Sequence, residues 1–130
     1  MLSIYNIGDE KKYDKKVNSS DIAAFESGVV HDVYATFAIA RDAEWCCRLF
    51  VLDMKETDEE GIGTYVTVNH HAPAMVNASI NFTAEITDLQ GNNVHCKWEA
   101  KDQERLIASG TTGQKILKKA KLESLFNSLK

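Results

Sequence analysis

Three kinds of side chain in this sequence carry acid–base or nucleophilic chemistry: the carboxylate of Glu44, the imidazoles of the adjacent His70 and His71, and the hydroxyl of Thr36. A carboxylate beside a histidine fixes the tautomer of the ring, which then works as a general base. A threonine hydroxyl becomes a nucleophile or a proton relay only next to such a base. These residues therefore form a site only if the fold brings them together.

Glu44 belongs to the segment Tyr34–Asp53, which contains no Gly or Pro and has apolar residues on nearly every side. This pattern predicts a buried helix that other elements must cover. On such a helix Arg41, Glu44 and Arg48 lie within about 60° of one another. Two interpretations of Glu44 stay open. It pairs with both arginines on a solvated stripe, or it stands at the edge of the core and orients a base or a water.

The two histidines end an alternating segment that begins at Gly63. Because neighbouring strand residues point to opposite faces, one face carries His70 together with Thr64, Val66 and Val68. We expect that face to look toward the helix and His71 to look away. Two histidines on opposite faces are poorly placed to bind one metal ion, so we predict no metal site.

The rest of the chain alternates as antiparallel strands do, so that one curled sheet is expected to wrap the helix. Further strands are expected over 79–86, 94–100 and 106–117, with turns at 90–93 and 101–104 and a lysine-rich edge strand over 12–17. Before the long helix we expect a short helix from an Asn18 cap to Glu26, an irregular segment over 29–35, and Thr36 as the N-cap. After it we expect a polar loop over 55–61. The tail 118–130 has the stripe of an amphipathic helix.

Length and charge narrow the classes of function. The chain has 130 residues, enough for one domain, and a net charge of −4, which argues against a nucleic-acid partner. No apolar stretch approaches the roughly 20 residues that span a bilayer, and the N-terminus lacks a signal-peptide pattern. The three cysteines form no C-x-x-C pair, and Cys46 and Cys47 suit a helix core. We therefore expect a cytoplasmic protein without a membrane partner.

Several motifs resemble one known family. They are S-G-V-V-H-D-V-Y-A-T ending at Thr36, the Glu44-Trp45 pair eight residues later, G-I-G-T-Y-V-T-V-N-H-H-A-P from Gly61, and T-D-L-Q-G-N-N-V from Thr87. Over residues 1–117 the chain resembles the fluoroacetyl-CoA thioesterase family of hotdog-fold acyl-CoA thioesterases.

The resemblance implies an α+β hotdog fold over 1–117, followed by the amphipathic helix over 118–130. The catalytic threonine, glutamate and histidine of the family fall on Thr36, Glu44 and His70. Its strand glycine near the acyl group falls on Gly63, and three residues near these positions, Phe37, Thr64 and Pro73, are expected to contact the substrate. Family members are homodimers with two sites at the interface, and use no metal or cofactor. A tetramer of stacked dimers stays open.

The chain departs from the family in two places. Phe37 replaces the usual proline after the threonine, and residues 74–77 replace a second proline and a glycine. The order of the residues separates the chain from another hotdog class. Glu44 precedes His70, whereas hotdog dehydratases of the hydroxyacyl carrier-protein type place their histidine before the helical acid.

From the resemblance we expect hydrolysis of a short or medium acyl-CoA thioester. The alternative is a hotdog dimer that binds acyl-CoA, or a related acyl ligand, without turnover.

One geometric difficulty follows from the spacing. Eight residues of straight helix separate Thr36 from Glu44 by roughly 12 Å and about 80°. Either Thr36 lies in a lead-in that folds back over the helix, or Thr36 and Glu44 of one chain serve different sites of a dimer.

An acidic protein that binds CoA needs local basic residues for the phosphates of CoA. The candidates, by strand position, are Lys97, Lys101, Arg105 and Lys115.

Overall fold

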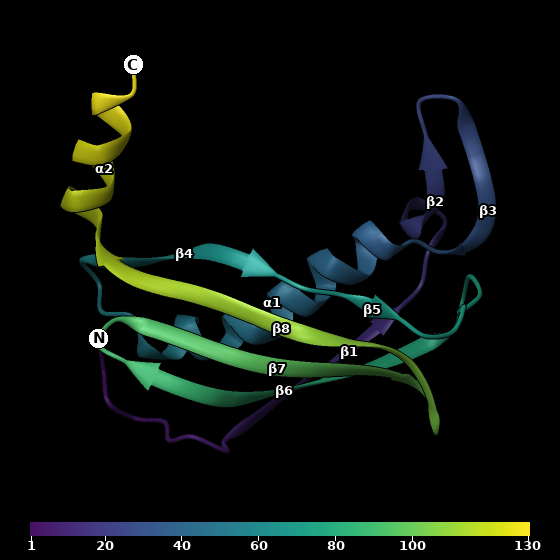
Figure 1. The fold of residues 1–130 in the computed structure, drawn as a ribbon, viewed down its shortest axis with the longest axis horizontal. Coiled ribbons are helices and arrows are strands. Elements are labelled where there is room, and N and C mark those ends of the chain that lie inside the picture. Colours follow the sequence, from purple (N-terminus) through teal and green to yellow (C-terminus); the bar gives the residue numbers. More distant parts are fainter.

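A computed structural model describes residues 1–130, and its central feature is one long helix inside a curled sheet (Figure 1). The elements in chain order are β1 (Glu10–Lys16), the single 3-10 turn η1 (Ser19–Asp21), β2 (Ile22–Phe25), β3 (Gly28–Tyr34), α1 (Thr36–Met54), β4 (Glu59–Val66), β5 (Asn69–His70), β6 (Ser79–Gln90), β7 (Asn93–Asp102), β8 (Arg105–Lys118) and α2 (Lys119–Ser128).

The main sheet is antiparallel, in the order β1-β6-β7-β8-β4, and β5 extends the β4 edge by pairing with β8. Alternate residues of β6 and β7 are buried against α1, so that Phe82 and Trp98 pack with ring centroids 6.1 Å apart. The turns between β6, β7 and β8 fall where the sequence predicted them, with Gly91 and Gln103 at positive φ. The expected helix-in-sheet architecture is confirmed.

The segment before α1 differs from the expectation. Asn18 does cap a turn, and Asp21 completes the capping box, but the turn ends at Asp21 instead of running to Glu26. The next residues form a hairpin of β2 and β3, where an irregular segment was expected over 29–35. Gly28 allows the reversal with a φ of +113°. Valines dominate β3, and β-branched residues favour strands over helix or coil.

The segment after α1 also differs. The loop expected over 55–61 is shorter, because β4 begins at Glu59, which pairs with Lys118 of β8. The edge of β4 away from β8 has no partner strand. No helix combines the length and apolar character needed to cross a membrane.

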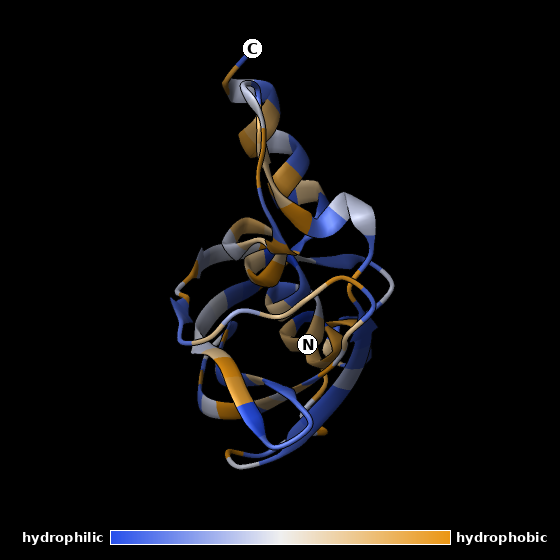
Figure 2. Cartoon of the chain, turned by 90° about the vertical axis from the view of Figure 1, so that its right-hand side faces the viewer, coloured by the Kyte–Doolittle hydropathy of each residue, from blue (hydrophilic) through white to orange (hydrophobic).

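Two elements stand out from the body. The β2–β3 hairpin and α2 project in the same direction from opposite ends of the edge formed by β4 and β5 (Figure 1). The hydropathy colouring in Figure 2 shows apolar segments along the projecting C-terminal helix. Only Leu122 of α2 is buried against the body.

Candidate active site

Thr36 and His70 meet at the N-terminus of α1. The Thr36 Oγ1 lies 2.9 Å from Nδ1 of His70, which closes a contact across 34 residues of sequence. Thr36 is the first residue of α1, and Ala35 occupies the N-cap position without a side-chain bond. The expectation that Thr36 caps the helix is therefore wrong. Its hydroxyl is directed to the imidazole instead, where it can donate its proton to a base.

The adjacent histidines point in different directions, as the alternation predicted. His70 faces α1, whereas Nε2 of His71 lies 2.8 Å from Oγ of Ser109 on β8. In the single chain both rings are exposed. A shallow hollow of about 230 Å³ is lined by His70, His71, Ala72 and Pro73, so Pro73 lies beside the Thr36–His70 pair.

Glu44 lies against Gly63 and forms no ion pair. A Cβ added at position 63 would overlap Oε1 of Glu44, so the carboxylate occupies the space that glycine leaves open. The alternative in which Glu44 pairs with two arginines is not realised. Arg48 bonds to Glu60 and to the carbonyl of Gly61. The Glu44 carboxylate is thus half-buried at the edge of the core and free to accept a hydrogen bond.

Arg41 joins three buried side chains, Asp21, Asp42 and Tyr34, in a network that the sequence analysis missed. Arg41 binds Asp21 at 2.7 Å and Asp42 at 3.0 Å, and the Tyr34 hydroxyl donates to Asp42. Burial, followed by the Asp42 carboxylate, raises the pKa of Tyr34, so the phenol keeps its proton. An acidic residue on the otherwise apolar side of the helix, Asp42, was the signal available in the sequence.

Two backbone hydrogen bonds hold the chain immediately before Thr36. The N–H of Ala35 donates to the carbonyl of Asp21, and the N–H of Tyr34 donates to the carbonyl of Ala74. The position of Thr36 is therefore fixed by two segments that are distant in sequence.

One chain contains two separate pairs. Thr36 with His70 stands at the start of α1, and Glu44 with Gly63 stands two turns further along. Since Thr36 belongs to α1, the lead-in that would fold back over the helix is absent. About 12 Å of helix rise separates the two pairs.

The other predicted substrate contacts fall differently. Phe37 is half-exposed and packs edge-on against Phe25 of the hairpin, with ring centroids 6.1 Å apart. Thr64 does not join either pair, because a bulge between Gly63 and Tyr65 breaks the alternation of β4. The Thr64 hydroxyl and the Tyr65 ring both lie over Gly113. The prediction that Thr64 shares a strand face with His70 is therefore wrong, because the bulge shifts Thr64 out of the alternation.

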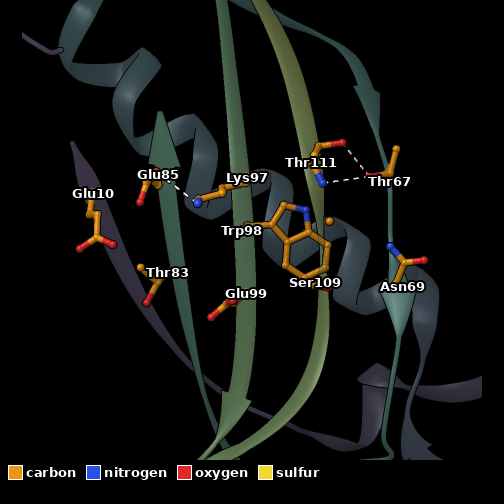
Figure 3. A pocket seen from close by; sticks show the side chains of 11 residues that line it. Glu10, Thr67, Asn69, Thr83, Glu85, Lys97, Trp98, Glu99, Ser109 and Thr111 are labelled. Carbon is orange, nitrogen blue, oxygen red and sulfur yellow. Dashed lines mark hydrogen bonds and ion pairs between the residues drawn. The ribbon is translucent and has the colours of Figure 1, made fainter. Parts of the chain in front are cut away.

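The cysteines lie in the core, and a second hollow lies on the outer face of the sheet. All three cysteines are buried, and burial raises the pKa of Cys46 to about 12, as suits a core residue. No cluster of three or more His, Cys, Asp or Glu side chains is placed to hold a metal ion. A hollow of about 380 Å³ lies on the sheet face away from α1 (Figure 3). In this hollow Glu85 pairs with Lys97 and Thr67 bonds to Thr111, while Ser109, which also lines it, is the partner of His71.

Solved structures with this architecture are hotdog proteins. A thioesterase superfamily member from Thermus thermophilus superposes with a TM-score of 0.93 at 35% identity, covering 98% of this chain and 95% of that one. A hot-dog-like protein from Thermanaerovibrio acidaminovorans gives 0.87 at 19% identity, covering 95% and 92%. A variant of the fluoroacetyl-CoA-specific thioesterase gives 0.87 at 21%, covering 97% and 98%. The chain has the hotdog fold.

Sequence comparison then places the chain more narrowly. Residues 17–120 match the family of fluoroacetyl-CoA-specific thioesterases. A fluoroacetyl-CoA thioesterase from Streptantibioticus cattleyicolor is 27% identical over 86 residues, which are 66% of this chain and 62% of that curated relative. This protein belongs to the fluoroacetyl-CoA-specific thioesterase family.

Proposed function

We propose that this protein is a thioester hydrolase that acts on a short or medium acyl-CoA. The observation that carries the proposal is the 2.9 Å contact between the Thr36 hydroxyl and His70, in a chain of a thioesterase family. Solved relatives include a complex with fluoroacetate and CoA and a variant with acetyl-CoA, which supports an acyl-CoA substrate here. The three free, buried cysteines suit a reducing cytoplasm.

In the proposed mechanism Nδ1 of His70 accepts the proton of the Thr36 hydroxyl. The Thr36 oxygen then attacks the thioester carbonyl. Alternatively, Thr36 takes a proton from a water molecule as it gives its own to His70, and the water attacks the carbonyl. The C–S bond breaks as the tetrahedral intermediate collapses, and the imidazolium returns its proton to the CoA sulfur. Glu44 orients the attacking water or the base. On the threonine route, water then cleaves the acyl ester with His70 again as the base.

The proposed active form is a homodimer whose site includes residues of both chains. The lysine-rich β1 edge is protected against further pairing, whereas β4 pairs only with β8 and carries neither lysine nor proline on its open edge. Beside that edge α1 leaves Phe37, Trp45 and Leu52 exposed. An antiparallel β4–β4 contact would cover them. It would also let Glu44 of one chain serve the Thr36–His70 pair of its partner, which fits the separation of the two pairs within one chain.

A panel of acyl-CoA thioesters, assayed for release of free thiol, tests the activity. We expect turnover with one or more short or medium chains, and loss of turnover in Thr36→Val. The alternative is an acyl-CoA-binding dimer without catalysis. Saturable binding of every thioester in the panel, with no thiol released above the uncatalysed rate, would establish that alternative.

A further inference from the structure

Two elements of this chain are poorly stabilised by the chain itself. The β2–β3 hairpin is a separate two-stranded sheet, and five of the seven residues of β3 are exposed. A lone two-stranded ribbon is marginal in water. The helix α2 has ten residues, no acidic residue in its first turn and no side-chain N-cap, and an isolated helix of that length is also marginal.

Both elements present large apolar side chains to solvent. On the hairpin Phe25, Val29 and Val30 are between 51 and 64% exposed. On α2 the residues Leu125, Phe126 and Leu129 are between 46 and 78% exposed, and they form one stripe with the buried Leu122. Within a chain the two patches cannot meet, because they stand at opposite ends of the β4–β5 edge (Figure 1).

The charges of the two elements are complementary. Between Ile22 and Tyr34 the hairpin carries Glu26 and Asp32 and no lysine or arginine. From Lys119 to the C-terminus the chain has three lysines and one glutamate. Opposite signs on two apolar surfaces favour their association and discourage each from pairing with its own copy.

We infer that α2 of one chain packs on the β2–β3 hairpin of a second copy of this chain. The inference rests on the homodimer proposed above. Antiparallel pairing of two β4 strands relates the copies by a two-fold axis across the edge. Around this axis, the end of the β4–β5 edge that carries α2 in one copy lies beside the end that carries the hairpin in the other copy. Because both elements project toward the same side, each helix then lies against the partner's hairpin.

The contact joins the partner to the candidate site. Phe25 of the hairpin packs on Phe37, which directly follows Thr36. The partner's α2 would therefore hold the apolar wall next to the Thr36–His70 pair, in addition to enlarging the dimer interface.

Engineered disulfides test the contact. Val29→Cys/Leu125→Cys should form a disulfide-linked dimer under mild oxidation, at a yield at least about tenfold above Val29→Cys/Ser124→Cys, since a disulfide requires Cα atoms within about 7 Å. Ser124 is the matched control. It is next to Leu125 in the sequence, but its side chain is on the opposite side of the helix from Leu122. The native cysteines are buried.

Hydrogen exchange gives a second readout. Leu125→Asp/Leu129→Asp should raise amide exchange in residues 22–34 by about tenfold or more, whereas Ser124→Asp should not. Light scattering on the same samples separates the two proposals. A monomeric wild type removes both the proposed dimer and this contact. A dimeric wild type with equal cross-linking in both cysteine pairs, or unchanged exchange in the hairpin, overturns the contact and leaves the dimer standing.

Discussion

The Thr36 hydroxyl and Nδ1 of His70 lie 2.9 Å apart, although the two residues are 34 positions apart in the chain. If His70 is the base in this pair, His70→Ala should lower kcat by roughly 10² or more, as expected for the loss of a general base. His71→Ala removes only the bond to Ser109 and is the matched control. Steady-state kinetics decides, and equal kcat in wild type and His70→Ala would rule out the assignment.

Mixed dimers test whether one site draws on two chains. Thr36→Ala and Glu44→Ala should each be inactive. After unfolding and refolding together in equal amounts, they should recover about a quarter of wild-type activity, since half of the dimers are mixed and each has one intact site. No recovery, despite mixed dimers seen by mass spectrometry of differently tagged chains, would place Thr36 and Glu44 of the same chain in one site.

Gly63 should be required for the position of Glu44. A Cβ at position 63 would overlap Oε1 of Glu44, so Gly63→Ala should displace the carboxylate and lower kcat by about tenfold or more. Glu44→Asp, added to Gly63→Ala, shortens the side chain and should restore part of the rate. Circular dichroism serves as the control for folding. Full activity in Gly63→Ala would show that the close approach is irrelevant to catalysis.

The Asp21 carboxylate should stabilise the fold at neutral pH and not in acid. Burial alone would raise its pKa, but hydrogen bonds from Arg41 and from the Asn18 backbone, with Lys15 nearby, outweigh this and lower it. A depressed folded pKa gives stability that is present above the unfolded value of about 3.9 and is lost as the pH falls through the folded value.

Asp21→Asn should therefore cost roughly 1.5 to 3 kcal/mol of unfolding free energy at pH 7. The difference from wild type should begin to shrink below pH ~4, where Asp21 of the unfolded chain takes up its proton, and should vanish only below the lower pKa of the folded state. Urea titrations at fixed protein concentration measure both values. Glu123→Gln, at an exposed residue without an ion pair, is the control. A cost that is equal at pH 7 and pH 3 would contradict the charge-based account.

The salt dependence of KM should show whether the nucleotide phosphates of acyl-CoA contact the protein. Of the four basic candidates for the CoA phosphates, Lys97, Lys101 and Arg105 already pair with acidic residues, and only Lys115 does not. We expect KM for acyl-CoA to rise with salt and to rise in Lys115→Gln, because screening weakens exposed charge pairs. Pantetheine thioesters, which lack the nucleotide phosphates, should change little. The same salt response for both substrates would argue against a phosphate contact.

The sequence by itself determined the elements whose signal is local and periodic. The run without Gly or Pro produced α1, and the alternation of β6 and β7 set which residues are buried. Asn18 and Asp21 formed the predicted cap because a capping box needs only four consecutive residues. The direction of His70 toward the helix also followed from alternation, and the motif resemblance predicted Thr36, Glu44 and Gly63 as site residues.

Only the tertiary structure decided what each of these residues touches. A side chain as short as that of Thr36 is an N-cap or a partner of His70 according to which group the fold places within 3 Å, and local sequence carries no such distance. The bulge at Gly63 moved Thr64 out of phase, and strand pairing turned residues 22–34 into a hairpin. Of the two interpretations of Glu44, pairing with Arg41 and Arg48 is not realised, because Asp21, Asp42 and Glu60 bind these arginines. Contacts between distant segments depend on the packing of the whole chain, which local periodicity does not encode.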